Sequence, residues 1–165
     1  MTTVVYRDGV LAADTQITYG ATIMPCKVKK LTKLPNGSLY GYCGSVEYGE
    51  IMKKSLINIS KADGVLEDRR DLDKENFEGI LVTPEGETLF FENRSWISVK
   101  VPYVAMGSGK EHAYGALALG ASAKQAVRSA ILLDPGSGGN IQAISIPWDK
   151  PQAYVEKMEL VNESE

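Results

Sequence analysis

The strongest constraint on the fold is a pair of short apolar runs near the start of the chain, separated by Asp8-Gly9. An Asp-Gly pair between two such runs is typical of a two-residue β-hairpin, because the turn needs positive φ at both central residues. The sequence therefore predicts strands over residues 2–7 and 10–14. Any fold for this chain has to begin with this hairpin.

The hairpin also predicts a register. With a two-residue turn, Val5 lies opposite Ala12 and Thr3 opposite Asp14, so the second strand carries Asp14 back to the chain start. Asp14 then falls on the side of Thr3. A bulge or a twisted last pair would be needed to bring its carboxylate to Thr2.

The rest of the chain alternates between strand and helix patterns. Further strands are expected at 16–19, 22–24, 28–34, 38–44, 79–83, 87–92, 96–101, 103–107, 141–146 and 153–160. Helices are expected at 45–61, after Gly109, and from Ser122, where Ser-x-x-Gln forms a capping box. Residues 63–76 are highly charged and are expected to be a loop, with room for a short helix.

Runs of strands separated by runs of helices indicate an α+β domain rather than a parallel α/β fold. Two antiparallel sheets need two covered faces, which the helix at 45–61 and the helices at 110–133 would supply. The length of 165 residues favours one domain, 1–165.

Composition excludes several classes of function. The net charge of −3 gives no basic surface for nucleic acid, and no apolar run is long enough to span a membrane. The first residues lack the pattern of a signal peptide, and Cys26 and Cys43 are too few for a disulfide scaffold. We therefore expect a cytoplasmic protein with reduced cysteines. No spacing of His, Cys, Asp and Glu fits a zinc or calcium site.

Thr2 is the first candidate for catalysis. Methionine aminopeptidases generally act when the second residue is small, so removal of Met1 would make Thr2 the chain terminus. A free α-amine has a pKa of about 7.7–8.0, which suits a base at neutral pH. An N-terminal threonine therefore carries a nucleophile and its base on one residue. The alternative is an ordinary hairpin start without chemistry.

Asp14 and Lys27 are the charged candidates. Asp14 is either an edge aspartate that caps a turn or a carboxylate beside the chain start. Lys27 precedes an alternating stretch that also holds Lys29, Lys30 and Lys33, and most of these lysines are expected on a solvated face. A catalytic role requires one ammonium turned inward beside a carboxylate, where it would lower the pKa of a neighbouring hydroxyl and amine.

Two Gly-Ser segments complete the candidates. Residues 105–112 contain Gly-Ser-Gly-Lys, but a Walker A loop needs glycine where Val104 stands and Ser or Thr where Glu111 stands. Ser108 with Glu111 also fits a capping box. Residues 134–140 fit a plain turn from helix to strand, in which the glycines allow positive φ.

Taken together, these segments resemble the proteasome β-type and HslV-like threonine peptidases. The likeness covers nearly the whole chain and rests on the order of five segments: TTVVYRDGVLAADTQ, TIMPCKVKKL, GYCGS, AMGSGKEHA and LDPGSGGNI. The resemblance implies an N-terminal-nucleophile hydrolase fold, a four-layer αββα sandwich of two antiparallel sheets between helical layers. It also implies hydrolysis of peptide bonds.

The resemblance assigns roles residue by residue. It implies Thr2 as nucleophile, Asp14 as the buried aspartate, Lys27 as the catalytic lysine and Gly44 as the oxyanion-hole glycine. Ser108, Asp134 and Ser137 would orient the amine. In the substrate cleft, Thr18 would pair with substrate backbone, and Tyr42 and Val46 would line an apolar first specificity pocket.

The resemblance further implies polypeptide substrates, homo-oligomeric stacked rings and, from the HslV likeness, an ATP-dependent AAA+ unfoldase partner. No cofactor is expected, although a monovalent cation near residues 133–139, as occurs in relatives, stays open. The alternatives are a catalytically silent ring subunit, an amide hydrolase for small molecules on the same fold, and a binding domain with a coincidental Met-Thr start.

Overall fold

The computed structural model describes residues 2–62, 64–72, 77–92 and 94–150. The predicted hairpin is present as β1 (Thr3–Arg7) and β2 (Val10–Asp14). Its register is the predicted one, with Val5 opposite Ala12. Asp8 and Gly9 both have positive φ, 48° and 79°, as the two-residue turn requires.

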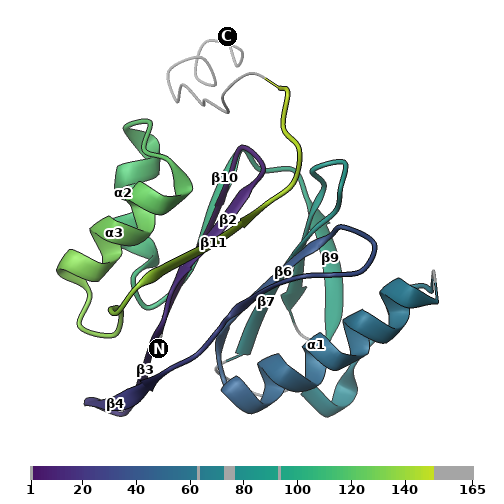
Figure 1. Cartoon of the computed structure of the whole chain (residues 1–165), viewed down its shortest axis with the longest axis horizontal. Helices are drawn as coiled ribbons and strands as arrows, with labels where there is room; N and C mark the ends of the chain where they lie inside the picture. Colours follow the sequence, from purple (N-terminus) through teal and green to yellow (C-terminus); the bar gives the residue numbers. More distant parts are fainter. Residues whose placement is uncertain (1, 63, 73–76, 93, 151–165) are drawn as a thin grey trace, which may run out of the picture.

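Two antiparallel sheets form around this hairpin (Figure 1). A four-stranded sheet has the order β10-β1-β2-β11, with β10 at Tyr103–Gly107 and β11 at Ile141–Ser145. A five-stranded sheet has the sequential order β5 to β9: Leu31–Lys33, Leu39–Gly44, Phe77–Val82, Thr88–Glu92 and Ser95–Val99. The remaining pair, β3 (Gln16–Tyr19) and β4 (Thr22–Lys27), forms a separate two-stranded ribbon.

The helices cover these sheets on opposite sides (Figure 1). Helix α1 (Val46–Lys61) packs on β6 and β7, whereas α2 (Lys110–Ala118) and α3 (Ala123–Leu133) pack on the four-stranded sheet. Three apolar clusters fill the spaces: one between the two sheets, one under α1, and one under α2 and α3. Burial of these clusters is the main driving force for this arrangement.

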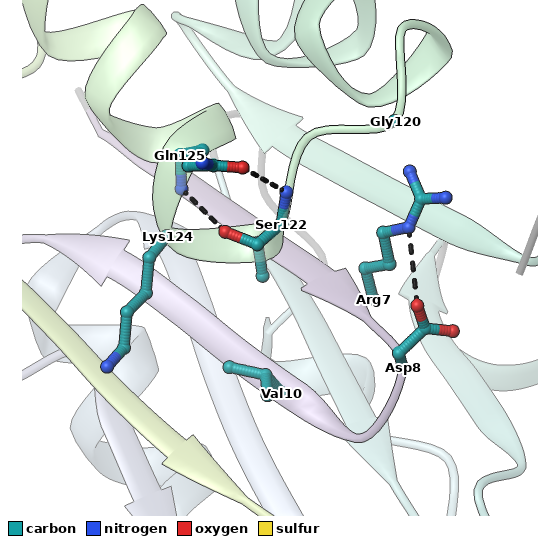
Figure 2. A pocket seen from close by; sticks show the side chains of 8 residues that line it. Arg7, Asp8, Val10, Gly120, Ser122, Lys124 and Gln125 are labelled. Carbon is teal, nitrogen blue, oxygen red and sulfur yellow. Dashed lines mark hydrogen bonds and ion pairs between the residues drawn. The ribbon is translucent and has the colours of Figure 1, made fainter. Parts of the chain in front are cut away.

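The helix starts test the capping predictions. The capping box of α3 is confirmed, since the Ser122 side chain accepts from the Gln125 backbone and the Gln125 side chain accepts from the Ser122 backbone (Figure 2). The alternative capping box at Ser108 is wrong. Gly109 is the N-cap of α2 and no side chain caps it, so the Ser108 hydroxyl is available for other contacts.

The charged segment contains a short 3₁₀ helix, η1, at Arg70–Leu72. The strand expected at 153–160 lies outside the described residues. Among the described residues, none of the helices has the length and apolar character of a membrane span.

Candidate active site

Thr2 lies directly before β1 and is buried. Its carbonyl oxygen accepts a hydrogen bond from the backbone N–H of Ser108 at 2.9 Å. This contact depends on Gly107, which has φ +92° and whose absent Cβ would overlap the Thr2 carbonyl oxygen. Glycine at this position therefore lets the end of β10 approach the chain start closely.

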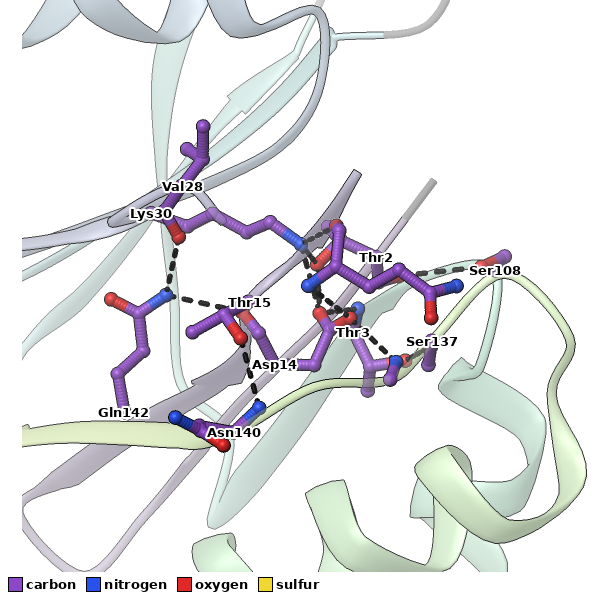
Figure 3. A network of polar contacts seen from close by, with 12 residues as sticks. Thr2, Thr3, Asp14, Thr15, Val28, Lys30, Ser108, Ser137, Asn140 and Gln142 are labelled. Carbon is purple, nitrogen blue, oxygen red and sulfur yellow. Dashed lines mark hydrogen bonds and ion pairs between the residues drawn. The ribbon is translucent and has the colours of Figure 1, made fainter. Parts of the chain in front are cut away.

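The Asp14 carboxylate faces Thr2 from the end of β2 and is fully buried (Figure 3). Its Oδ1 atom accepts from the Thr2 hydroxyl and, at 3.0 Å, from the backbone N–H of Thr3. Of the two routes expected from the sequence, a bulge or a twisted last pair, the bulge is absent, since the ladder from Val4–Ala13 to Arg7–Val10 is regular. The carboxylate reaches both residues from the predicted register.

The ammonium beside Thr2 belongs to Lys30, which corrects the prediction of Lys27. Lys30 Nζ donates to the Thr2 hydroxyl, to Asp14 Oδ1 at 3.0 Å and to the Gln16 carbonyl oxygen at 2.7 Å. Lys30 is 4% exposed. Lys27 is exposed at the end of β4, where it lies opposite Gln16 in the ribbon.

The physical reason for this correction is the end of strand β4. The chain leaves the ribbon after Lys27 and enters β5 only at Leu31, so residues 28–30 are not in a strand. Simple alternation therefore cannot assign faces to the lysines here. Burial lowers the pKa of Lys30, and the opposing attraction of Asp14 offsets part of that effect.

A second polar cluster lies on the other side of the chain start. Asp134 Oδ2 accepts hydrogen bonds from the hydroxyls of Ser108 and Ser137, each at 2.6 Å. The Ser137 hydroxyl also lies 2.7 Å from the Thr3 hydroxyl. Although partial burial raises the pKa of Asp134, the bonds from Ser108 and Ser137 outweigh it and hold the pKa below its usual value. Ser108, Asp134 and Ser137 are thus brought together as a group.

The remaining predicted residues lie around the ends of β3 and β6. Gly44 ends β6 with φ +90° and is exposed, and Val46 is the first residue of α1. Thr18 lies on β3 opposite Ile23. Tyr42 is 2% exposed and packs in the cluster under α1, with its hydroxyl 3.5 Å from Glu50 Oε1. Its ring is a packed core group here, so contact with a substrate stays a prediction.

Sequence reasoning missed several residues that contact this network, among them Gln16 and Gln142. The Gln16 carbonyl accepts from Lys30, and the Gln142 side chain donates to the carbonyl of Asp14 at 3.1 Å. Gln16 ends the first of the five segments without an assigned role, and Gln142 directly follows the last. Gln16 acts through its backbone carbonyl, which every residue has, and Gln142 contacts a residue far away in the sequence. A local sequence pattern can therefore reveal neither contact. Over the described ranges, the model holds no cluster of three or more His, Cys, Asp or Glu suited to a metal ion.

No family model and no curated protein matches the sequence. Solved structures do match its fold. Thiobacillus denitrificans BPH in complex with epoxomicin is 19% identical, with a TM-score of 0.65 over 90% of this chain and 99% of that chain. Eukaryotic HslV from Trypanosoma brucei is 20% identical, with a TM-score of 0.68 over 88% of this chain and 98% of that chain.

These likenesses define the class of fold. The chain has the fold of HslV and the proteasome β-type subunits, as the sequence resemblance predicted. At 19–20% identity, the likeness carries the arrangement of helices and strands, and the chemistry has to be argued from the residues of this chain.

Proposed function

We propose that this chain is a threonine-type peptidase whose nucleophile is Thr2, with the four-layer sandwich of the N-terminal-nucleophile hydrolases. One observation carries the proposal. The buried Thr2 hydroxyl donates to the Asp14 carboxylate and accepts from the Lys30 ammonium. A nucleophile held in hydrogen-bond contact with charged groups is the signature of an activated hydroxyl.

In the proposed reaction, removal of Met1 frees the α-amine of Thr2. The amine, directly or through one water, takes the proton of the hydroxyl as its oxygen attacks the peptide carbonyl carbon. The Lys30 ammonium stabilises the negative charge on this oxygen and favours the neutral form of the amine. Asp14 holds the ammonium in place and balances its charge.

The tetrahedral intermediate places negative charge on the former carbonyl oxygen, which the backbone N–H of Gly44 would bind. Loss of one such donor typically costs about 10²–10³ in turnover. The intermediate collapses when the α-amine passes its proton to the leaving amine, which leaves an ester on Thr2. Water then hydrolyses the ester, with the α-amine again accepting and returning a proton.

The second polar cluster would orient the amine. Asp134 accepts from both Ser108 and Ser137, so the two hydroxyls have fixed directions. Ser108 is also bound to the Thr2 carbonyl through its backbone N–H, and this contact to the residue that bears the amine supports the orienting role. A fixed amine lone pair contributes to rate by orientation.

Polypeptides are the proposed substrates. Thr18 on β3 would pair with substrate backbone, and Tyr42 and Val46 would form an apolar first specificity pocket. A homo-oligomeric stacked ring would confine the threonine site, and an AAA+ unfoldase would supply unfolded chains. BPH has been solved with epoxomicin bound, so a peptide epoxyketone is the probe of choice for this chain.

The test is intact-mass spectrometry of the purified protein after incubation with a peptide epoxyketone. We expect loss of Met1, one adduct per chain, and peptide mapping that places the adduct on Thr2. The matched Thr2→Ala variant should remain unmodified. A chain that loses Met1, is folded and forms no adduct would contradict the proposal. Retention of Met1 would favour a silent ring subunit, and turnover of small amides without peptides would favour a small-molecule hydrolase.

A further inference from the structure

Gln142 links the backbone of Asp14 to the backbone of Val28, which precedes Lys30 by two residues (Figure 3). It lies on β11, opposite Ala13 of β2. Its side-chain Nε2 donates to the carbonyl of Asp14 at 3.1 Å and to the carbonyl of Val28 at 3.2 Å. One amide group therefore spans from the residue that bears the carboxylate to a point two residues before Lys30.

The Val28 contact fixes a segment that has no strand ladder. Residues 28–30 connect β4 to β5. The Val28 N–H donates to the Thr15 carbonyl at 3.2 Å, and its own carbonyl accepts from Gln142. Both polar backbone groups of Val28 are thus held by the segment that follows β2 and by β11. The Lys30 side chain reaches Thr2 from this anchored segment.

The orientation of the Gln142 amide is determined by its partners. Two carbonyl oxygens face it, so the NH₂ group must point toward them. The opposite atom, Oε1, is buried without a hydrogen-bond partner among the described residues. A buried acceptor without a partner costs free energy, which offsets much of what the two donated bonds contribute to folding. Stability alone is therefore a weak reason for glutamine at this position.

We propose that Gln142 is a positioning residue that sets the separation of the Lys30 ammonium and the Asp14 carboxylate around the Thr2 hydroxyl. It does not contact Thr2 and takes no part in proton transfer. As an account of reaction rate, this inference rests on the proposed threonine-peptidase function. As an account of where the Lys30 ammonium is held, it is testable without any turnover.

The experiment uses Gln142→Met, which keeps the length of the side chain and removes both donated bonds. Gln125→Met is the matched control, since Gln125 is exposed in the capping box of α3 and makes no contact with the network around Thr2. Two quantities are measured in each protein. One is the maximal rate of Thr2 modification by a peptide epoxyketone, with its half-saturating concentration. The other is the NMR titration midpoint of Lys30 in protein with isotope-labelled lysine, assigned with Lys30→Arg.

For Gln142→Met we expect the maximal rate to fall about 10- to 100-fold, because a displaced catalytic group loses near-attack geometry. The half-saturating concentration should be unchanged. The Lys30 midpoint should rise toward the ordinary value of about 10.4 as the ammonium gains solvent. Gln125→Met should change neither quantity.

The outcomes separate the two ideas. If wild-type Thr2 never reacts, the proposed function fails, and the Lys30 midpoint alone decides the role of Gln142. A folded Gln142→Met protein with the wild-type midpoint overturns the inference. Should Gln142→Met fail to fold, Gln142→Asn repeats the test with an amide one methylene too short. Failure of both to fold would assign Gln142 to fold stability and also overturn the inference.

Discussion

Two aspartates flank the chain start, and they do different work. Both carboxylates accept from backbone N–H groups, but fully buried Asp14 also pairs with the Lys30 ammonium, whereas partly buried Asp134 is bound to two serine hydroxyls. The first aspartate belongs to a charged pair that acts on the Thr2 hydroxyl. The second holds two hydroxyls, one of them on Ser108, whose backbone N–H binds the Thr2 carbonyl. Under the proposed mechanism, the buried ion pair acts on the Thr2 hydroxyl as nucleophile, and the Asp134 cluster would orient the Thr2 amine as base.

The largest expected effect comes from removing the ammonium. Lys30→Met should lower the rate of Thr2 modification by an epoxyketone by about 10²–10³-fold, the range typical of losing one group that stabilises developing negative charge. Lys27→Met is the matched control, with the same substitution three residues away on an exposed strand, and should react at the wild-type rate. Intact-mass time courses of both variants decide the matter. Equal losses in the two would contradict the assignment of Lys30.

The next effect is on stability. Asp14→Asn leaves the Lys30 ammonium buried without its counter-charge, and breaking one side of a buried pair typically costs about 3–5 kcal/mol of unfolding free energy. The double variant Asp14→Asn with Lys30→Met carries no unpaired buried charge, so it should recover part of this loss. Urea unfolding of the single and double variants measures both. A single variant as stable as wild type would show that the pair is not coupled.

Asp134→Asn should have a smaller effect. A neutral amide oxygen accepts more weakly than a carboxylate, so each serine bond weakens by about 1 kcal/mol and the modification rate falls modestly.

The Asp134 carboxylate stabilises the fold above the unfolded pKa of about 3.9, and this contribution is lost as the pH falls through the lower folded value. The variant should therefore lose less stability on acidification than wild type does. Urea unfolding at pH 6 and pH 3 tests this, and an unchanged acid dependence would refute it.

The smallest expected effect is the contribution of Lys30 to the pH dependence of the unfolding free energy at alkaline pH. Its pKa is lowered in the folded chain, so between the folded value and about 10.4 the unfolded chain binds more protons and stability rises with pH. The slope is at most about 1.4 kcal/mol per pH unit. Lys30→Met removes this rise, which urea unfolding at pH 8 and pH 10 would detect. A variant with the wild-type slope would contradict the burial of a titrating Lys30.

The sequence contained most of the fold because its local signals agree with one another. The Asp8-Gly9 turn, the register of the hairpin and the Ser122–Gln125 capping box are short-range features, and all three are confirmed. Once the hairpin is fixed, the alternation of side chains along each strand determines which residues lie on the same face of the sheet. Packing of α1 and α3 on opposite sides of the sheets follows from their apolar stripes.

The site was less predictable, because its key choices are made between strands. Lys27, Lys29 and Lys30 are chemically equivalent in sequence, and the end of β4 decides which one turns inward. The sequence around Ser108 is compatible both with a helix capping box and with a hydrogen bond to Asp134. The structure decides between these interpretations, because α2 begins at Lys110 with Gly109 as its N-cap and the Ser108 hydroxyl donates to Asp134. Gln142 acts on backbone carbonyls, for which no sequence motif exists.

The central claim is that the Lys30 ammonium and the Asp14 carboxylate hold the hydroxyl of a terminal threonine. A crystal structure of the processed chain, beginning at Thr2, tests it most directly. We predict Lys30 Nζ at about 2.7–3.2 Å from both Thr2 Oγ and the Asp14 carboxylate, the range of ordinary hydrogen bonds. A Lys30 ammonium directed into solvent, or the Lys27 ammonium in its place, would contradict the account.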